Sequence, residues 1–324
     1  MKKTLLTICL VWMCFSLSAQ KIIDLSGKWS FSIDRQDNGE KEKWFSHTLN
    51  DFINLPGSMP EKLKGDEVTA KTQWTGSLYD SSYYYNPYME KYRKEGNIKF
   101  PFFLTPDKHY VGAAWYQKEV NIPADWKGER ILLFLERPHI ETTVWVNGQK
   151  TGMQNSLCVP HQYDITRYVR PGKCTITIRV DNRIKEINVG PDSHSITDQT
   201  QGNWNGIVGR ICLQTTPKTY FDDIQIYPEP EQKLARVKVV IKGTGTAKVK
   251  LSAESFNTDK KHIVPAIQQE IKLNKGVTET EMVLPMGNDM LLWDEFHPAL
   301  YKLKAEVTNG KKTEIKEIQF GIRR

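Results

Sequence analysis

The chain has 324 residues, of which 26% are charged, and its formal net charge is +7. This length allows two domains, each large enough to bury its own core. Basic residues stand beside acidic ones, as in Lys118-Glu119 and Lys316-Glu317, so the small positive excess indicates a solvated surface and excludes nucleic acid as an expected partner.

Residues 1–19 have the pattern of a secretory signal peptide. Lys2 and Lys3 precede an apolar run from Leu5 to Leu17, and Ser18-Ala19 follows as a small-residue cleavage site. The run is too short for a spanning helix, and no other stretch approaches membrane length. The sequence therefore predicts an exported protein, periplasmic or extracellular, without membrane insertion.

Beyond residue 19 the chain has three cysteines, Cys158, Cys174 and Cys212. An odd number in an exported protein leaves at least one unpaired, and the spacing shows neither a disulfide framework nor a metal site. Their pairing stays open, and we expect no metal and no cofactor. Cys174 continues the register of Ile176 and Ile178, which favours a small buried residue.

The first predicted strand covers Ile22–Asp34, where apolar and polar residues alternate around Trp29 and Phe31. A turn at Leu55-Pro-Gly-Ser58 then opens a long irregular region. Within that region, residues 74–103 include ten aromatic residues. We expect these rings mainly to pack the insertion onto the fold, and the alternative is a stacking wall for sugar rings.

Short predicted strands follow along the rest of the first half of the chain. They cover residues 111–120, 131–135, 142–146, 175–180 and 210–213. Because no helical periodicity separates them, the pattern favours a β-sandwich of the jelly-roll kind. Asn147-Gly148 directly follows an alternating strand and predicts a type I′ hairpin turn.

The composition changes at Thr215-Thr-Pro-Lys218, which places a domain boundary there. The expected domains are residues 20–217 and residues 218–324. The second domain repeats a simple alternation, as in Val237, Val239 and Ile241, and this pattern predicts an immunoglobulin-like β-sandwich.

A long polar loop between two predicted strands, residues 190–211, carries the candidate carbohydrate-binding site. Its candidate binding residues are His194, Asp198, Gln201, Asn203, Trp204 and Asn205. Amides and carboxylates form paired hydrogen bonds with hydroxyl groups, and an indole ring offers an apolar face to a sugar. No nucleophile in the loop stands beside a base.

Three of these residues also have a structural alternative. Trp204 is equally consistent with a core residue that closes the rim of the sandwich. Asp198 and His194 are alternatively turn residues that bond to backbone amides, as short polar side chains in loops commonly do.

Several motifs, in their order along the chain, resemble glycoside hydrolases of family 2, the β-galactosidase and β-glucuronidase family. They are Gly27–Trp29, Trp115–Val120, Val144–Gly148, His161–Thr166, Val180–Asn182, Trp204–Arg210, Trp293–Tyr301 and Phe320–Arg323. The resemblance implies a sugar-binding jelly-roll domain, galactose-binding-like, followed by an immunoglobulin-like domain. The expected fold class is therefore all-β, with two successive β-sandwiches.

In that family the chain continues after the Phe-Gly-Ile-Arg motif into a (β/α)₈ barrel that carries both catalytic glutamates. A barrel needs about 200 residues or more, and here only Arg324 follows the motif. A retaining mechanism needs two carboxylates about 5 Å apart on a rigid frame, and the sequence offers no candidate pair. We therefore expect no catalytic residues in this chain.

The resemblance also implies the partners of the chain. They are a galactoside- or glucuronide-like glycan and a (β/α)₈ barrel, either as a further domain or as a downstream polypeptide. In this interpretation the chain is the accessory, carbohydrate-binding portion of a hydrolase. The alternative is a free-standing exported carbohydrate-binding or adhesion module without enzymatic function.

Overall fold

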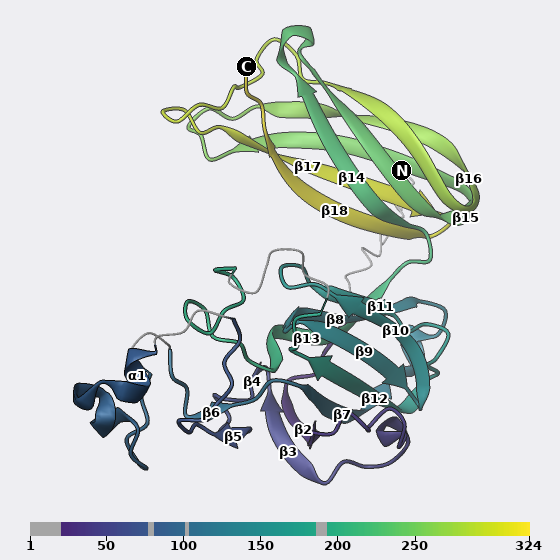
Figure 1. Ribbon diagram of the computed structural model, residues 1–324. Helices are drawn as coiled ribbons and strands as arrows, with labels where there is room; N and C mark the ends of the chain where they lie inside the picture. The colour runs from purple at the N-terminus through teal and green to yellow at the C-terminus, as the bar shows by residue number, and fades with distance from the viewer. Residues whose placement is uncertain (1–20, 77–80, 101–103, 186–192) are drawn as a thin grey trace, which may run out of the picture. The chain divides into compact units, whose positions relative to one another are not determined.

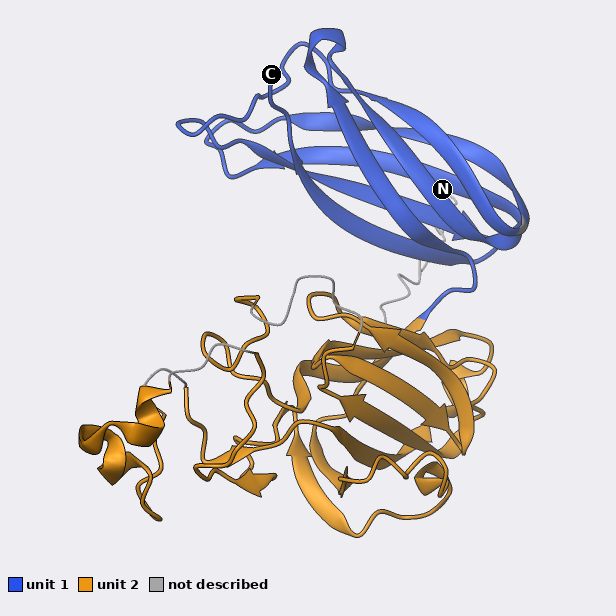
Figure 2. Cartoon of the chain, viewed as in Figure 1, with its two compact units in different colours: residues 1–20, 216–324 blue, residues 21–215 orange. Residues whose placement is uncertain are grey.

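The computed structural model describes residues 21–76, 81–100, 104–185 and 193–324 (Figure 1). The predicted signal peptide lies outside the described residues. The described chain divides into two compact units, residues 21–215 and residues 216–324 (Figure 2). Within the described ranges, no helix is long and apolar enough to cross a membrane.

The first unit is built on two sheets. A six-stranded sheet has the order β10-β9-β12-β7-β2-β3, and a second sheet has the order β1-β13-β8-β11, with β4 paired to β13. The strands of the larger sheet are β2 (Gly27–Asp34), β3 (Asp51–Leu55), β7 (Ala113–Ile122), β9 (Glu141–Val146), β10 (Gln149–Asn155) and β12 (Gly172–Asp181). Those of the smaller sheet are β1 (Ile22–Asp24), β4 (Gly57–Ser58), β8 (Arg130–Pro138), β11 (His161–Asp164) and β13 (Gly206–Thr216).

The core of the first unit lies between these sheets, because alternate residues of each strand point to the same face. Trp29, Phe31 and Ile178 of the larger sheet join Leu133 and Leu213 of the smaller sheet in one buried cluster. Each buried side chain of this size stabilises the folded state by about 1.5–3 kcal/mol. The alternation read from the sequence is thus the pattern of a two-layer sandwich.

The opposite face of the larger sheet carries a smaller apolar cluster. Trp115 and Trp145 are buried there against residues 44–49. The ring of Phe45 stacks on Trp145 with the centroids 5.1 Å apart. A short 3₁₀ helix, η1 (Trp44–Ser46), contributes Trp44 and Phe45 to this cluster. Both faces of the sheet are therefore covered at its centre.

The predicted hairpin turn joins β9 to β10. Asn147 and Gly148 both have positive φ, at 49° and 77°, as a type I′ turn requires. Val146 pairs with Gln149 across the turn. The Asn147 side chain also donates to the carbonyl of Tyr168 and accepts from the amide of Thr175, which fixes the turn to its neighbours.

The aromatic insertion contains short helices and one small ribbon. They are α1 (Ser82–Tyr85), η2 (Pro87–Tyr92), β5 (Asp66–Glu67) and β6 (Lys108–His109); a further 3₁₀ helix, η3 (Ala124–Trp126), follows β7. Tyr83 and Phe100 are buried and stacked on each other, as expected for packing residues. Tyr85 and Tyr88, in contrast, are 72% and 85% exposed. The rings thus divide between packing and exposure.

The second unit is a sandwich folded from one connected sheet. Its elements are β14 (Tyr220–Glu229), η4 (Pro230–Gln232), β15 (Leu234–Phe256), β16 (Ile263–Pro285), β17 (Leu300–Asn309) and β18 (Lys312–Gly321). The long strand β15 pairs with β14 along its first half, with β17 along its second half, and with β16 over most of its length. Alternate residues such as Val237, Val239 and Leu303 form a fully buried core. The expected all-β class, with two successive sandwiches, is confirmed.

The three described cysteines are all free. Cys174 and Cys212 are buried and Cys158 is exposed. Burial raises the pKa of the Cys174 thiol to about 11, so it packs as a neutral side chain. The structure groups no His, Cys, Asp and Glu side chains of its described residues in a way that could hold a metal ion.

Candidate functional site

Asp198 anchors the described part of the polar loop, residues 193–205, to the first unit. Its Oδ2 accepts from the backbone amide of Thr75 at 2.6 Å, and its Oδ1 accepts from the amide of Asn203. The amide of Asp198 donates back to the Thr75 carbonyl at 3.1 Å. With 2% of its surface exposed, Asp198 holds two distant chain segments together.

His109 on β6 completes the surroundings of this carboxylate. Its Nε2 lies 3.4 Å from Asp198 Oδ2, and its ring packs edge-to-face with the indole of Trp74, with 4.8 Å between the centroids. Burial by itself raises the pKa of Asp198, but the His109 contact and the amides of Asn203 and Thr75 outweigh it and hold that pKa below its ordinary value. The carboxylate is therefore ionised at neutral pH.

Asn203 joins the same buried network. Its Nδ2 donates to Thr75 Oγ1 and to the carbonyl of Asn182, both at 3.0 Å, and its Oδ1 accepts from Asn182 Nδ2 at 3.0 Å. Asn182, directly after β12, also binds the backbone at Tyr110 and Gly112. The loop is thus bonded to the end of the larger sheet.

Asn205 is fully buried, and each of its side-chain polar atoms has a partner. Its Oδ1 accepts from the hydroxyl of Tyr116 at 2.7 Å. Its Nδ2 donates to the carbonyls of Gly112 and Val180 at 2.9 and 3.0 Å. One amide therefore joins β7, β12 and the start of β13 at the rim of the sandwich.

The backbone crosses closely where the loop enters β13. Gly206 has a φ of 144°, and a Cβ at this position would lie 2.5 Å from the carbonyl oxygen of Gly57. The carbonyl of Asn205 accepts from the Met59 amide at 2.7 Å, and that of Gly206 accepts from the His139 amide at 3.2 Å. Glycine is required here by both the backbone conformation and the contact with β4.

The other three predicted site residues reach the surface. Trp204 is half-buried and His194 and Gln201 are exposed. The indole of Trp204 stacks on the imidazole of His139, with centroids 4.4 Å apart and 20° between the planes. The six predicted residues therefore separate into three that fix the loop and three that face solvent, and their carbohydrate-binding role stays a prediction.

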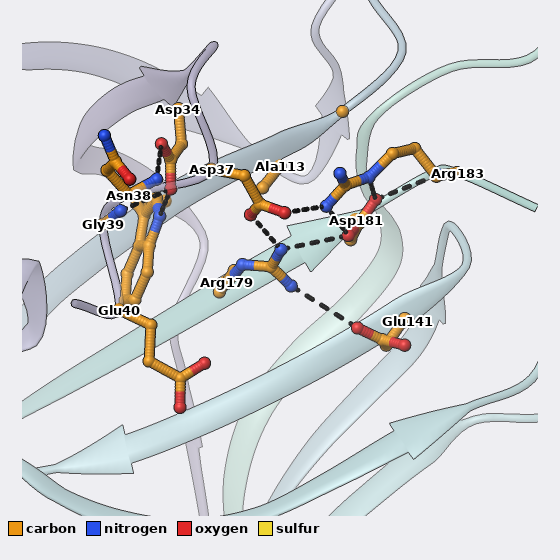
Figure 3. A network of polar contacts seen from close by, with 12 residues as sticks. Asp34, Asp37, Asn38, Gly39, Glu40, Ala113, Glu141, Arg179, Asp181 and Arg183 are labelled. Carbon is orange, nitrogen blue, oxygen red and sulfur yellow. Dashed lines mark hydrogen bonds and ion pairs between the residues drawn. The ribbon is translucent and has the colours of Figure 1, made fainter. Parts of the chain in front are cut away.

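Sequence reasoning missed a second polar cluster, which lies at the end of β12 (Figure 3). Arg179 donates through Nη2 to Asp37 at 2.6 Å and to Asp181 at 3.0 Å, and through Nη1 to Glu141 at 3.4 Å. Arg183 donates to Asp37 and Asp181, both at 2.6 Å. Burial opposes ionisation of Asp181, yet the bonds from its basic neighbours hold its pKa far below the usual range.

Two family models together match almost the whole described chain. Residues 22–217 match "Glycosyl hydrolases family 2, sugar binding domain", and residues 219–323 match "Glycosyl hydrolases family 2". The chain belongs to glycosyl hydrolase family 2. This confirms the resemblance found in the sequence motifs.

Relatives of this family 2 chain bear the names of enzymes and are about twice its length. It is 24% identical to β-glucuronidases of Paenibacillus borealis and Homo sapiens, covering 94% and 93% of this chain but 46% and 44% of those proteins. It is 22% identical to the β-galactosidase large subunit of Lactobacillus acidophilus, of which it covers 46%. The chain thus spans less than half the length of these relatives.

Solved structures show the same fold. The β-glucuronidase of an uncultured Clostridium species superposes with a TM-score of 0.59 at 20% identity, covering 94% of this chain and 45% of that one. The Ruminococcus gnavus β-glucuronidase gives a TM-score of 0.60 at 18% identity, with 94% and 44% covered. Both comparisons support the sandwich architecture of the family 2 domains.

Four residues that organise the loop of this family 2 chain were absent from the predicted site: Thr75, His109, His139 and Asn182. Only Asn182 stood in a recognised motif, Val180–Asn182. Thr75 and His109 precede Asp198 by 123 and 89 residues. No local pattern marks such contacts, because they depend on the path of the insertion.

Proposed function

We propose that this chain is the carbohydrate-binding and accessory portion of an exported family 2 glycoside hydrolase. Its glycan is galactoside- or glucuronide-like, and its protein partner is a (β/α)₈ barrel that supplies both catalytic carboxylates. The names of the relatives, β-glucuronidase and β-galactosidase, support this substrate class. The signal-like residues 1–19 support export to the periplasm or the extracellular space.

One observation carries the proposal: the polar loop has a rigid base and an exposed tip. Asp198, Asn203 and Asn205 are each at most 4% exposed, and their hydrogen bonds fix the backbone on both sides of Trp204. A binding surface held in this way loses little conformational freedom when a ligand arrives. The loop is therefore suited to positioning a substrate.

The exposed residues have the chemistry for a sugar. The half-buried indole of Trp204 presents an apolar surface to sugar C–H groups, and the amide of Gln201 donates to and accepts from hydroxyls. Burial lowers the pKa of His139 to about 4, so the ring behind Trp204 is neutral at neutral pH. In a retaining hydrolase the two carboxylates carry the reaction, while such a loop orients the substrate.

The test is reconstitution of the chain with a family 2 barrel, either fused or mixed. The complex should hydrolyse an aryl galactoside or glucuronide, and the purified chain alone should not. Trp204→Ala and Gln201→Ala should each lower kcat/KM by about ten- to a hundredfold, the effect of one lost stacking contact or hydrogen bond. Gln214→Ala on β13 is the control and should change little.

Two results would contradict the proposal. Turnover by the purified chain alone would reveal a catalytic site within these residues. Unchanged kcat/KM in both loop variants, with an active complex, would show that the loop does not meet the substrate. Tight glycan binding by the chain without any barrel would instead favour a free-standing adhesion module.

A further inference from the structure

A polar cavity of about 490 Å³ opens at one end of the larger sheet of the first unit. It lies where β2 ends and β7 begins, and the β5–β6 ribbon forms one wall. Its lining includes Arg35, Asp66, Thr69, Gln73, His109 and Arg183. The volume is in the range of small-ligand sites, which is about 300–1,000 Å³. Trp204, Gln201 and His194 do not line it, so it is separate from the loop surface.

Ion pairs form much of the cavity wall. Arg35 donates through Nε and Nη2 to Asp66 Oδ1, and both side chains are about half exposed, at 54% and 56%. Lys108 pairs with Glu67 across the β5–β6 ribbon. The Arg35–Asp66 pair places a donor group beside an acceptor group at the cavity surface, whereas only Glu67 of the second pair lines the cavity. A sugar hydroxyl, which donates and accepts at once, matches this arrangement.

The deeper wall is held by the cluster drawn in Figure 3. Asp37 and Arg183, which line the cavity, bond to each other and to the buried Asp181 and Arg179. These bonds fix the two lining side chains before any ligand arrives. Preorganised groups of this kind lower the entropy lost on binding.

Carboxylates outnumber cations among the residues that line the cavity. Asp37, Asp66 and Glu67 each pair with an arginine or a lysine. Asp34 instead accepts from the amides of Asn38 and Gly39 and from Trp115 Nε1, at 2.8–2.9 Å. The lining thus has four carboxylates, Asp34, Asp37, Asp66 and Glu67, against two arginines, Arg35 and Arg183, and an anionic sugar finds no unmatched cation among these lining groups. The wall favours a neutral ligand.

We propose that this cavity is a second carbohydrate site, which binds the neutral end of a saccharide. Thr69, Gln73 and the Arg35–Asp66 pair meet its hydroxyls, because all four side chains belong to exposed residues of the rim. His109 forms the floor and contacts Asp198, which anchors the loop. The site belongs to this chain alone and requires no barrel.

The test is saturation-transfer NMR with the purified chain and methyl β-galactoside, methyl β-glucoside, lactose or glucuronate. A neutral glycoside should bind with a Kd of about 1 mM, as expected for a small ligand in an open site. Arg35→Ala and Gln73→Ala should each weaken binding about tenfold. Lys150→Ala is the matched control, because it breaks the Lys150–Glu40 pair, which is also half exposed, at 49% and 53%, and lies outside the cavity.

Trp204→Ala should keep this binding, which separates the cavity from the loop surface. Loss of binding in Trp204→Ala, with both cavity variants unaffected, would overturn the cavity assignment and place the ligand on the loop. No signal with any neutral saccharide would also overturn it, and glucuronate binding more tightly than the neutral sugars would overturn the charge argument. Thermal unfolding of each variant shows that it is folded, and Gln73→Ala, an exposed position, keeps the test decisive if Arg35→Ala unfolds.

Discussion

The imidazole of His139 lies almost parallel to the indole of Trp204, with 4.4 Å between the ring centroids. His139 stands between β8 and β9 and is 8% exposed, whereas Trp204 immediately precedes the buried Asn205. The contact joins the rim of the smaller sheet to the polar loop. One face of the tryptophan is thereby held by the protein before any ligand binds.

The burial of His139 makes the stability of the first unit depend on pH. Burial lowers the pKa of His139 to about 4 from an ordinary value of 6.5. Between these pH values the unfolded chain binds a proton that the folded unit does not, so the free energy of unfolding falls as the pH falls from 6.5 to 4. The expected loss is on the order of 2–3 kcal/mol.

Urea unfolding at pH 7, 5.5 and 4.5 measures this dependence. His139→Gln should make the stability profile shallower in that window, and the remaining slope should come from the buried His161, whose pKa is also lowered by burial. His47→Gln, at an exposed position of the same unit, is the control. The carboxyl groups of Asp181 and Asp198 have lowered pKa values, so their contribution is lost only below pH 3.8. A flat wild-type profile between pH 6.5 and 4 would contradict the prediction.

Asn205→Ala should destabilise the first unit by about 3 kcal/mol, because it leaves the Tyr116 hydroxyl and two buried carbonyls without their partner. Gln201→Ala, at an exposed position of the same loop, should change stability by less than about 0.5 kcal/mol. Tryptophan fluorescence follows this unit selectively, since it holds seven of the tryptophans and residues 216–324 hold one. Equal midpoints of denaturant unfolding for Asn205→Ala and Gln201→Ala would refute the structural role of Asn205.

Arg179→Met should lower the free energy of unfolding by about 3–5 kcal/mol, because it leaves Asp181 buried without one of its cations. The side chain of Arg179 is 9% exposed, so salt should screen this cluster only weakly. The comparison is Lys238→Ala in the second unit, which breaks an exposed pair with Glu279 and should cost less than about 1 kcal/mol. If thermal unfolding shows a similar loss of stability for Arg179→Met and Lys238→Ala, the cluster around Arg179 does not stabilise the first unit.

Gly206→Ala should disturb the entry to β13 more than Gly202→Ala disturbs the loop. Both glycines have positive φ, but only at Gly206 does an added Cβ meet backbone atoms, those of Gly57 and Ser58. Gly202→Ala should cost about 1 kcal/mol from backbone conformation alone, and Gly206→Ala considerably more. Chemical denaturation of both variants measures which one loses more stability. A larger loss in Gly202→Ala than in Gly206→Ala would contradict the prediction.

The strands were predictable from the sequence because burial on one face imposes an alternation that is visible locally. Trp29 and Phe31, or Val237 and Val239, show this pattern, and the positive φ values of Asn147-Gly148 confirm the hairpin turn. Arg179 shows the limit of such reasoning. It occupies an outward position between Ile178 and Val180, yet Asp37 and Glu141 cover it. Its burial depends on a turn more than a hundred residues away in sequence.

The chemistry of the polar loop was visible in the sequence, but the direction of each side chain was not. A short polar residue serves equally well as a ligand contact or as a partner for the backbone. Asp198 and Asn203 bond to Thr75, in a segment that carries no sequence signal for this contact. Exposure of Trp204 and Gln201 likewise depends on that anchoring.

The first and last residues of the first unit lie side by side. The amide of Lys21 donates to Thr215 Oγ1 at 3.3 Å, and the amide of Thr215 donates to the Lys21 carbonyl at 2.9 Å. β1 and β13 continue this pairing through Ile22 and Gln214. A domain whose ends adjoin is suited to circular permutation and to insertion as a cassette into another protein. New termini opened at the exposed β9–β10 turn, with a short linker joining Lys21 to Thr215, should still give the same sandwich.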